Sequence, residues 1–176
     1  MSADAVPEVM TERLILRGHA LEDFPAYAAM WADPDVTRFI GGTPLSEEEA
    51  WGKFLRAFGQ WSVMGFGFWS VSEKSTGTRI GEVGFVEGRR NIVPSLLGVP
   101  ELGWAFVPGA HGKGYATEAA RAALCWGETH FGRVRMACII APDNAASLRV
   151  AAKLGFNEAL RTTYKNEPTL MLYRDP

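Results

Sequence analysis

Hydrophobic and polar residues follow strand-like and helix-like periods through the first third of the chain. Residues 12–17 (ERLILR) alternate in character as a strand does. Apolar residues recur at helical spacing over residues 21–31, which predicts a helix there. A second helix is expected after Ser46, because this N-cap residue precedes three glutamates that complement the helix dipole. Residues 1–10 are expected to form a loose N-terminal arm.

The remaining pattern predicts an antiparallel meander followed by a parallel unit. Three strand-like segments with turn residues between them favour the meander. The pattern then changes to a glycine turn, a helix, a strand and a second helix, and such strand-helix-strand units pair in parallel. The sequence therefore predicts an α/β fold of the α+β type, with a mixed sheet that has a parallel pair near its middle. The expected strands are residues 67–73, 78–87, 101–107, 135–141 and two within 156–173, and the expected helices are residues 117–131 and 145–154.

Length and charge narrow the possible classes of protein. A chain of 176 residues has room for one domain over residues 1–176, and 47% hydrophobic with 22% charged residues is typical of a globular fold. A formal net charge of −2 argues against nucleic acid or an anionic membrane as partner. The chain has neither a basic segment leading into an apolar one at its start nor a long apolar run. A cytoplasmic location is therefore expected.

The cysteines give no sign of a metal or redox site. Cys125 and Cys138 form neither a CxxC pair nor a zinc-type spacing with the three histidines. Both are expected to be buried thiols, and no metal is expected.

The glycine-rich turn at residues 108–116 is the segment with the clearest chemistry. It lies between a predicted strand and a predicted helix, and Gly112 and Gly114 allow close approach to its backbone. A helix N-terminus offers unpaired N–H groups with a partial positive charge, so such a turn binds a phosphate or pyrophosphate. An ordinary flexible turn is the alternative interpretation.

Two well-known phosphate loops do not match this turn. A Walker A loop needs Ser or Thr after Gly-Lys, whereas Gly114 follows Lys113, which argues against a nucleoside triphosphatase. In the dinucleotide fingerprint GxGxxG, the third glycine position is occupied by Thr117. A nucleotide-binding βαβ protein is kept as an alternative.

The turn and its neighbours resemble the GNAT superfamily of acetyl-coenzyme A-dependent N-acyltransferases. The pyrophosphate loop of that family reads Gln/Arg-x-x-Gly-x-Gly/Ala, and Gly114 and Ala116 fit its last two positions, whereas His111 departs from the first. The resemblance covers residues 11 to about 173. Four further segments are similar to the RimJ/RimL-type branch of ribosomal-protein N-acetyltransferases, namely ELGW at 101–104, TEA at 117–119, NAAS at 144–147 and KLGF at 153–156.

This resemblance implies a splayed sheet with acetyl-coenzyme A (acetyl-CoA) as cosubstrate. In the family, the strands before and after the loop separate, the pantetheine arm inserts between them, and helices flank the mostly antiparallel sheet. Main-chain N–H groups of the loop would bind the diphosphate, so side-chain identity matters less than loop shape. The expected coenzyme-binding residues are Trp104, Phe106, Val107, His111, Gly112, Lys113, Gly114, Tyr115, Ala116 and Asn144.

Acetyl transfer to an amine needs a base for the amine and an acid for the departing thiolate. Glu101, at the start of the strand that leads into the splay, is the first candidate base, and Glu82 is the second. Many family members use a tyrosine as the acid, but Ala151 stands at that position, and the branch resemblance points to Ser147. Asn144 would position the pantetheine arm. A solvated carboxylate for Glu101 and helix capping for Asn144 and Ser147 are the alternatives.

The expected function is direct transfer of an acetyl group to a primary amine, on a protein N-terminus or a small molecule. Trp31, residues 39–41 and Trp69 are expected to line the acceptor site, although such residues are also typical of a core. The apolar residues 92–99 would cover this site or contact a second subunit in a homodimer. An acyl-CoA-binding module without catalysis is the second hypothesis, because the tyrosine is missing and His111 is unusual.

Overall fold

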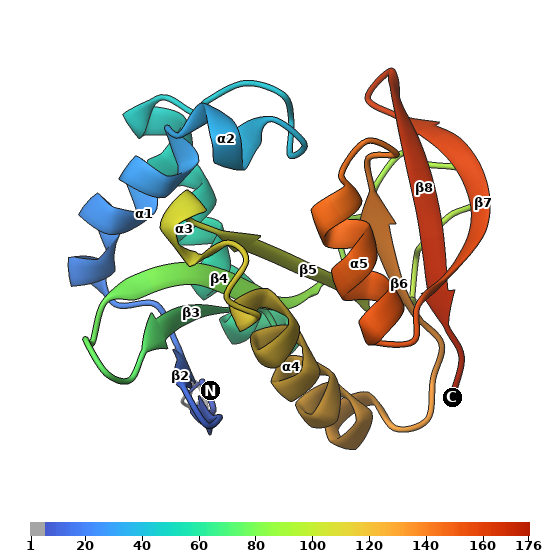
Figure 1. The fold of residues 1–176 in the computed structure, drawn as a ribbon. Coiled ribbons are helices and arrows are strands. Elements are labelled where there is room, and N and C mark those ends of the chain that lie inside the picture. The colour runs from blue at the N-terminus through green and yellow to red at the C-terminus, as the bar shows by residue number, and fades with distance from the viewer. Residues whose placement is uncertain (1–5) are drawn as a thin grey trace.

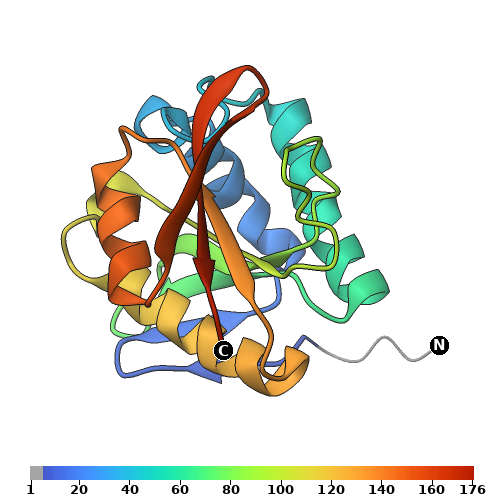
Figure 2. The same ribbon diagram turned by 90° about the vertical axis from the view of Figure 1, so that its right-hand side faces the viewer.

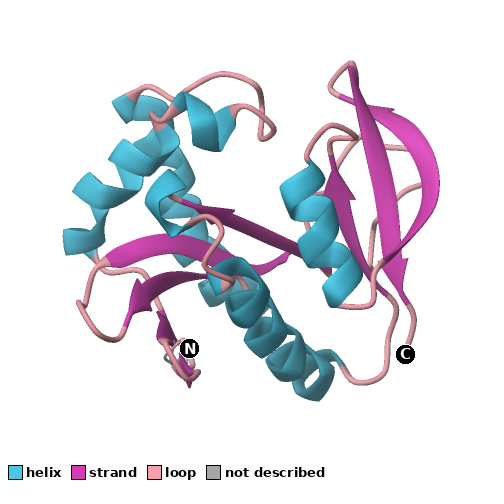
Figure 3. Ribbon diagram, in the orientation of Figure 1, coloured by secondary structure: helices cyan, strands magenta, loops and turns pink. Residues whose placement is uncertain are grey.

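The computed structural model of the chain describes residues 6–176, and one eight-stranded sheet runs through it in the order β1-β2-β3-β4-β5-β6-β8-β7 (Figures 1 and 3). The strands are β1 (Val9–Met10), β2 (Leu14–Arg17), β3 (Phe68–Glu73), β4 (Arg79–Val86), β5 (Glu101–Phe106), β6 (Met136–Ile140), β7 (Asn157–Tyr164) and β8 (Glu167–Arg174). The α-helices are α1 (Phe24–Trp31), α2 (Pro34–Thr37), α3 (Glu47–Met64), α4 (Tyr115–Phe131) and α5 (Ala145–Lys153), and short 3-10 helices span Leu21–Asp23 and Pro108–Ala110.

Every neighbouring pair of strands is antiparallel except β5 and β6, which confirms the predicted mixed sheet with a parallel pair near its middle. Helix α4 begins two residues before its predicted start, because Gly114 is its N-cap and has a φ of 80°. Helix α3 begins as expected, with Ser46 accepting a hydrogen bond from the N–H of Glu49.

The N-terminal arm is shorter than predicted. Residues 1–5 lie outside the described residues, but Val9–Met10 form β1 and pair with β2. The indole Nε1 of Trp69 also donates a hydrogen bond to the carbonyl of Pro7 at 2.8 Å. The prediction of a loose arm is therefore wrong for Val9–Met10, because a two-residue strand gives too short a pattern to recognise in sequence.

The parallel pair separates soon after it begins. Strands β4 and β5 stay in register from Val86 and Glu101 to Gly81 and Phe106. Strands β5 and β6 have one register pair, Glu101 with Ala137, and then diverge (Figure 1). The edge of β5 beyond Glu101 therefore has no strand beside it among the described residues.

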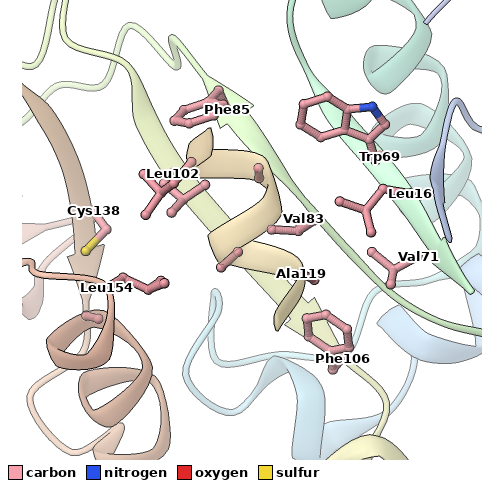
Figure 4. Close-up of a cluster of buried hydrophobic side chains, with 14 of the residues drawn as sticks. Leu16, Trp69, Val71, Val83, Phe85, Leu102, Phe106, Ala119, Cys138 and Leu154 are labelled. Carbon is pink, nitrogen blue, oxygen red and sulfur yellow. The ribbon is translucent and has the colours of Figure 1, made fainter. Parts of the chain in front are cut away.

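Helices cover both faces of the sheet. The largest hydrophobic cluster lies under α4 and α5, where Phe85, Leu102 and Phe106 meet Ala119 and Leu154 (Figure 4). The opposite face packs against α1 and α3. Figure 2 shows α5 and α3 on opposite sides of the sheet. Because side chains alternate along β5, Leu102 and Phe106 face α4 whereas Ala105 faces α1 and α3.

Candidate active site

The turn between β5 and α4 exposes a run of unpaired backbone donors. Gly112 and Gly114 have φ values of 74° and 80°, a region that glycine enters without steric cost, and they aim the chain into α4. Within the described part of the chain, the N–H groups of residues 112–117 donate no hydrogen bond, whereas the next one, of Glu118, donates to the carbonyl of Gly114. Six consecutive free N–H groups at a helix N-terminus form an anion-binding site.

Glu118 anchors this turn to the start of the sheet. Its carboxylate accepts hydrogen bonds from the hydroxyl of Thr11 at 2.6 Å, the backbone N–H of Arg13 at 2.9 Å and Nε of Arg13 at 2.7 Å. Burial alone would raise the pKa of Glu118, but these hydrogen bonds lower it below its ordinary value. Arg13 also donates to the carbonyl of Lys113 at 2.9 Å, and its guanidinium lies over the Tyr115 ring. The anchor keeps a cation beside the anion-binding turn.

The open edge of β5 offers backbone groups to a ligand at only some of the predicted residues. The N–H of Val107 donates to the carbonyl of Ile80 in β4 at 2.9 Å. Since backbone groups alternate along a strand, those of Trp104 and Phe106 face away from β4, into the gap beside β6. The prediction that Val107 pairs with pantetheine is therefore wrong. His111 lies at the edge of the gap, where its Nε2 is 2.9 Å from the carbonyl oxygen of Phe106.

Asn144 and Ser147 occupy the first turn of α5, directly after β6. Oδ1 of Asn144 accepts a hydrogen bond from the N–H of Ser147 at 3.1 Å, so Asn144 is the N-cap of the helix. Its amide NH₂ and the hydroxyl of half-buried Ser147 make no hydrogen bond with the described residues. Because β5 and β6 are parallel, their carboxyl ends lie at the same side of the sheet. The turn after β5 and the start of α5 therefore flank the open end of the gap.

The carboxylate of Glu101 is buried and hydrogen-bonded at both oxygens. Arg90 donates to both of its carboxylate oxygens, from Nε at 2.6 Å and from Nη2 at 2.7 Å. A third nitrogen of Arg90 donates to the hydroxyl of Tyr164 in β7 at 3.0 Å. Such a bidentate pair fixes a carboxylate in position and occupies one lone pair on each of its oxygens.

Glu82 lies on the same face of the sheet with much looser contacts. It is 3% exposed, and its oxygens are 3.9 Å from Nζ of Lys53 and 3.8 Å from Nη2 of Arg79. Its Oε2 accepts no hydrogen bond from the described residues. Tyr27 and Trp31 lie beside the two cations, with the Arg79 guanidinium over the Tyr27 ring and the Lys53 ammonium over the Trp31 ring.

The structure separates the residues that were expected to line an acceptor site. Trp69 is fully buried on the α4 side of the sheet, with its ring 4.8 Å from that of Trp61 and 5.0 Å from that of Trp126. It is a core residue, and its predicted place at the acceptor site is wrong. Trp31 lies on the opposite face, against α3. Ile40 and Gly41 are exposed in the turn after α2.

Residues 92–99 form part of the core of the C-terminal half. Ile92 and Leu96 are buried against Ala137 of β6 and Met171 of β8. Val93 remains exposed, and the structure describes one copy of the chain.

A groove of about 620 Å³ runs along α4 beside the anion-binding turn. Its lining includes three cationic side chains: Arg13, Arg121 of α4 and Lys153 of α5. Arg121 is not among the binding residues expected from the sequence. Its position one helical turn after Thr117 could have indicated that it lies near the turn before α4. The lining residues are Thr11, Glu12, Arg13, Gly114, Thr117, Glu118, Arg121, Ala122, Cys125 and Lys153.

The two cysteines differ in exposure. Cys125 is exposed in the groove wall, which contradicts the prediction of a buried thiol, whereas Cys138 is buried, as predicted. Burial raises the pKa of the Cys138 thiol far above its ordinary value.

Over residues 6–176, no helix combines the length and apolar character needed to cross a membrane. The same residues contain no group of three or more histidine, cysteine or acidic side chains placed to bind a metal ion.

A splayed parallel pair with free N–H groups at its open end defines an acyl-coenzyme A-dependent transferase fold. The acetyltransferase (GNAT) domain family matches residues 13–157, and the chain belongs to this family of acetyl-CoA-dependent N-acyltransferases. YkkB of Bacillus subtilis (strain 168) is 32% identical, over 97% of both chains. A putative GnaT-family acetyltransferase from Bordetella pertussis has the same fold, with a TM-score of 0.85, 31% identity and coverage of 96% of this chain and 99% of that one. At 16% identity, spermidine N-acetyltransferase from Vibrio cholerae, in complex with CoA and spermine, shares the fold with a TM-score of 0.73, covering 94% of this chain and 96% of that one.

Proposed function

We propose that this enzyme transfers an acetyl group from acetyl-CoA directly to a primary amine, on a peptide N-terminus or a small molecule. The observation that carries the proposal is the continuity of two features, the unpaired edge of β5 and the free N–H groups of residues 112–117. An extended pantetheine arm can pair with the β5 edge as a strand would, and a diphosphate can bind to the free N–H groups.

The residues present fit the coenzyme along its whole length. Both backbone groups of Trp104 and the N–H of Phe106 would pair with the pantetheine arm, since the Phe106 carbonyl already contacts His111. The amide of Asn144 would bind the arm from the other side of the gap. Residues 112–117 would bind the diphosphate. Arg121 and Lys153, in the groove next to this turn, would bind the outer phosphate of the nucleotide end.

Acetyl-CoA supplies a thioester, and the chain supplies the proton transfers. Glu82 fits the role of the base better than Glu101, because one of its oxygens is free whereas both oxygens of Glu101 accept hydrogen bonds from Arg90. Glu101 would act as a positioning residue at the start of the splay. The free hydroxyl of Ser147 would donate a proton to the departing sulfur.

Direct transfer means that no cysteine has to accept the acetyl group. Cys138 is buried with a raised pKa, so it is a poor nucleophile. Cys125 lies in the groove that would hold the nucleotide end of the coenzyme. Replacing both cysteines with alanine is expected to leave most turnover intact, and complete loss in a folded protein would contradict direct transfer.

Release of free thiol from acetyl-CoA, measured over a panel of amines and corrected for slow hydrolysis, tests the function. Amine-dependent release is the expected result. Calorimetric titration with CoA, ATP and NAD tests the alternatives. Binding of CoA without transfer to any amine would favour an acyl-CoA-binding module, and binding of NAD or ATP instead of CoA would favour a nucleotide-binding protein.

A further inference from the structure

Glu82 and two buried side chains beside it have polar atoms without hydrogen-bond partners. Nε1 of Trp31 and Nη2 of Arg79 are unsatisfied donors, and Oε2 of Glu82 is an unsatisfied acceptor, among the described residues. Trp31 and Glu82 are each 3% exposed, and the Arg79 side chain is 5% exposed. Leaving such groups unpaired in a protein interior is destabilising, so a cluster of three points to a ligand that pairs with them.

A β-bulge places two members of this cluster together. Val71 pairs with Gly81 and Ser72 with Arg79, so Ile80 is an extra residue in β4. In a regular strand, residues three apart face opposite sides of the sheet. The bulge brings Arg79 to the same face as Glu82, whereas Ile80 packs in the cluster on the other face. Bulges are often placed next to active sites, where they redirect a side chain.

The cluster has more donors and more positive charge than its one carboxylate can satisfy. Lys53 and Arg79 are the two cations within 4 Å of the Glu82 carboxylate, which leaves a formal charge of 2 − 1 = +1 among these three side chains. The charge of Asp23 also acts on Arg79, but Asp23 is itself paired with Arg17. The Lys53 ammonium is 3.9 Å from the Glu82 carboxylate, beyond hydrogen-bond distance, and the side chain is 30% exposed. Lys53 is therefore the member of the cluster that a molecule arriving from solvent can contact. Burial lowers its pKa, and an anion bound beside it would offset that effect.

We infer that the acceptor is an amine carrying a carboxylate close to its nitrogen, as in an amino acid, with Lys53 and Trp31 binding the carboxylate and Glu82 receiving the amine. This inference rests on the proposed function. The carboxylate brings acceptor oxygens to the free donors, and the ammonium form of the amine brings donors to the free oxygen of Glu82. A polyamine lacks the acceptors and would add positive charge to a site that already has an excess.

The cluster lies where such an acceptor has to be. Glu82 is in register with Ala105 of β5, and the residues on either side of Ala105 are those whose backbone groups face the gap. The side chain of Ala105 adds no bulk between the cluster and that strand.

The first test compares acceptors on the wild-type enzyme. Thiol release from acetyl-CoA is measured with a series of amino acids, with their carboxamides and with spermidine. Because a hydrogen-bonded charge pair is lost with the amide, kcat/KM for the acids is expected to exceed that for the amides by at least about tenfold. Equal or better use of the amides or spermidine would overturn this inference and leave the proposed function standing. No release with this series or with the wider panel of amines, peptides included, would refute both.

The second test assigns the preference to Lys53. In Lys53→Met, the ratio of kcat/KM for acid over amide is expected to fall about tenfold, mainly through KM for the acid. Arg133→Met is the matched control, because Arg133 is exposed in the turn after α4 and its loss removes the same charge away from the cluster. Its ratio is expected to stay as in the wild type. An unchanged ratio in Lys53→Met would overturn the role of Lys53, and the wild-type comparison stands even if that variant does not fold.

Discussion

Two glutamates face the same side of the sheet in neighbouring strands, yet their surroundings differ. Glu101 is bound through both oxygens to Arg90, whereas Glu82 has cations at 3.8–3.9 Å and one free oxygen. A base needs an accessible lone pair, and the second arrangement leaves a whole carboxylate oxygen without a hydrogen bond. Residue types and spacing predicted both candidates, but their hydrogen bonds depend on Arg90 and Lys53, which lie elsewhere in the sequence.

Matched substitutions of these glutamates separate catalysis from structure. Glu82→Gln is expected to lower kcat by about 100-fold or more with CoA affinity unchanged, since a general base is lost. Glu101→Gln is expected to destabilise the protein by about 3 kcal/mol, because a buried ion pair is broken. Steady-state kinetics and urea unfolding measure the two effects. A larger loss of kcat in Glu101→Gln, in a protein of wild-type stability, would assign the base to Glu101.

His19 makes stability depend on pH. It is 9% exposed, with its ring 5.6 Å from those of both Tyr27 and Phe54, and burial lowers its pKa to about 3, assisted by the charge of Arg79 and opposed by Asp23. The unfolded chain takes up this proton near pH 6.5, so between that pH and about 3 the unfolded state binds more protons. Stability therefore falls with decreasing pH, by up to about 1.4 kcal/mol per unit from this group.

Urea unfolding between pH 7 and 5, compared in wild type and His19→Leu, measures this contribution. The variant is expected to lose less stability over that interval, because leucine binds no proton. Identical slopes in the two proteins would show that His19 is not buried in its neutral form.

At the scale of elements, the turn before α4 depends on glycine at its last position. Gly114 has a φ of 80°, and an added Cβ would lie 3.5 Å from Nη2 of Arg13. Gly114→Ala is expected to cost about 1–2 kcal/mol of stability and to weaken CoA binding, because the free N–H groups would shift. Gly109→Ala is the control, since a Cβ there meets nothing within 4 Å. Calorimetry and thermal unfolding of both variants measure the effects, and equal CoA affinity in both would contradict the assigned role of the turn.

Most elements could be predicted because their ends carry local signals. Ser46 with its following glutamates and the glycines at 112 and 114 mark helix starts, and these depend on neighbouring residues alone. The bulge in β4 could not be predicted, because it depends on the register between two strands. The sequence also does not show which face of the sheet Trp69 occupies, or that the N–H of Val107 bonds to β4. Both depend on how the strands pair.

Over the whole molecule, the two halves of the sheet meet at one pair of residues, and the helices α4 and α5 flank the opening beyond it (Figure 1). The overall fold followed from the order of elements, since a strand-helix-strand unit in a sheet has one favoured handedness. The proposed chemistry depends on groups from different parts of the chain that this order brings together: the β5 edge, the turn before α4, the start of α5 and the bulged β4. The split sheet is therefore both the scaffold and the proposed binding site.

Amide hydrogen exchange, followed by NMR with and without CoA, tests this account most directly. The N–H groups of Trp104, Phe106 and residues 112–117 lack partners among the described residues, so they are expected to exchange fast in the free enzyme and slowly with CoA bound. Ala105 is the internal control, because its N–H faces β4 and is expected to be protected in both states. If saturating CoA left exchange unchanged at Trp104 and Phe106 and also at residues 112–117, the account would be contradicted.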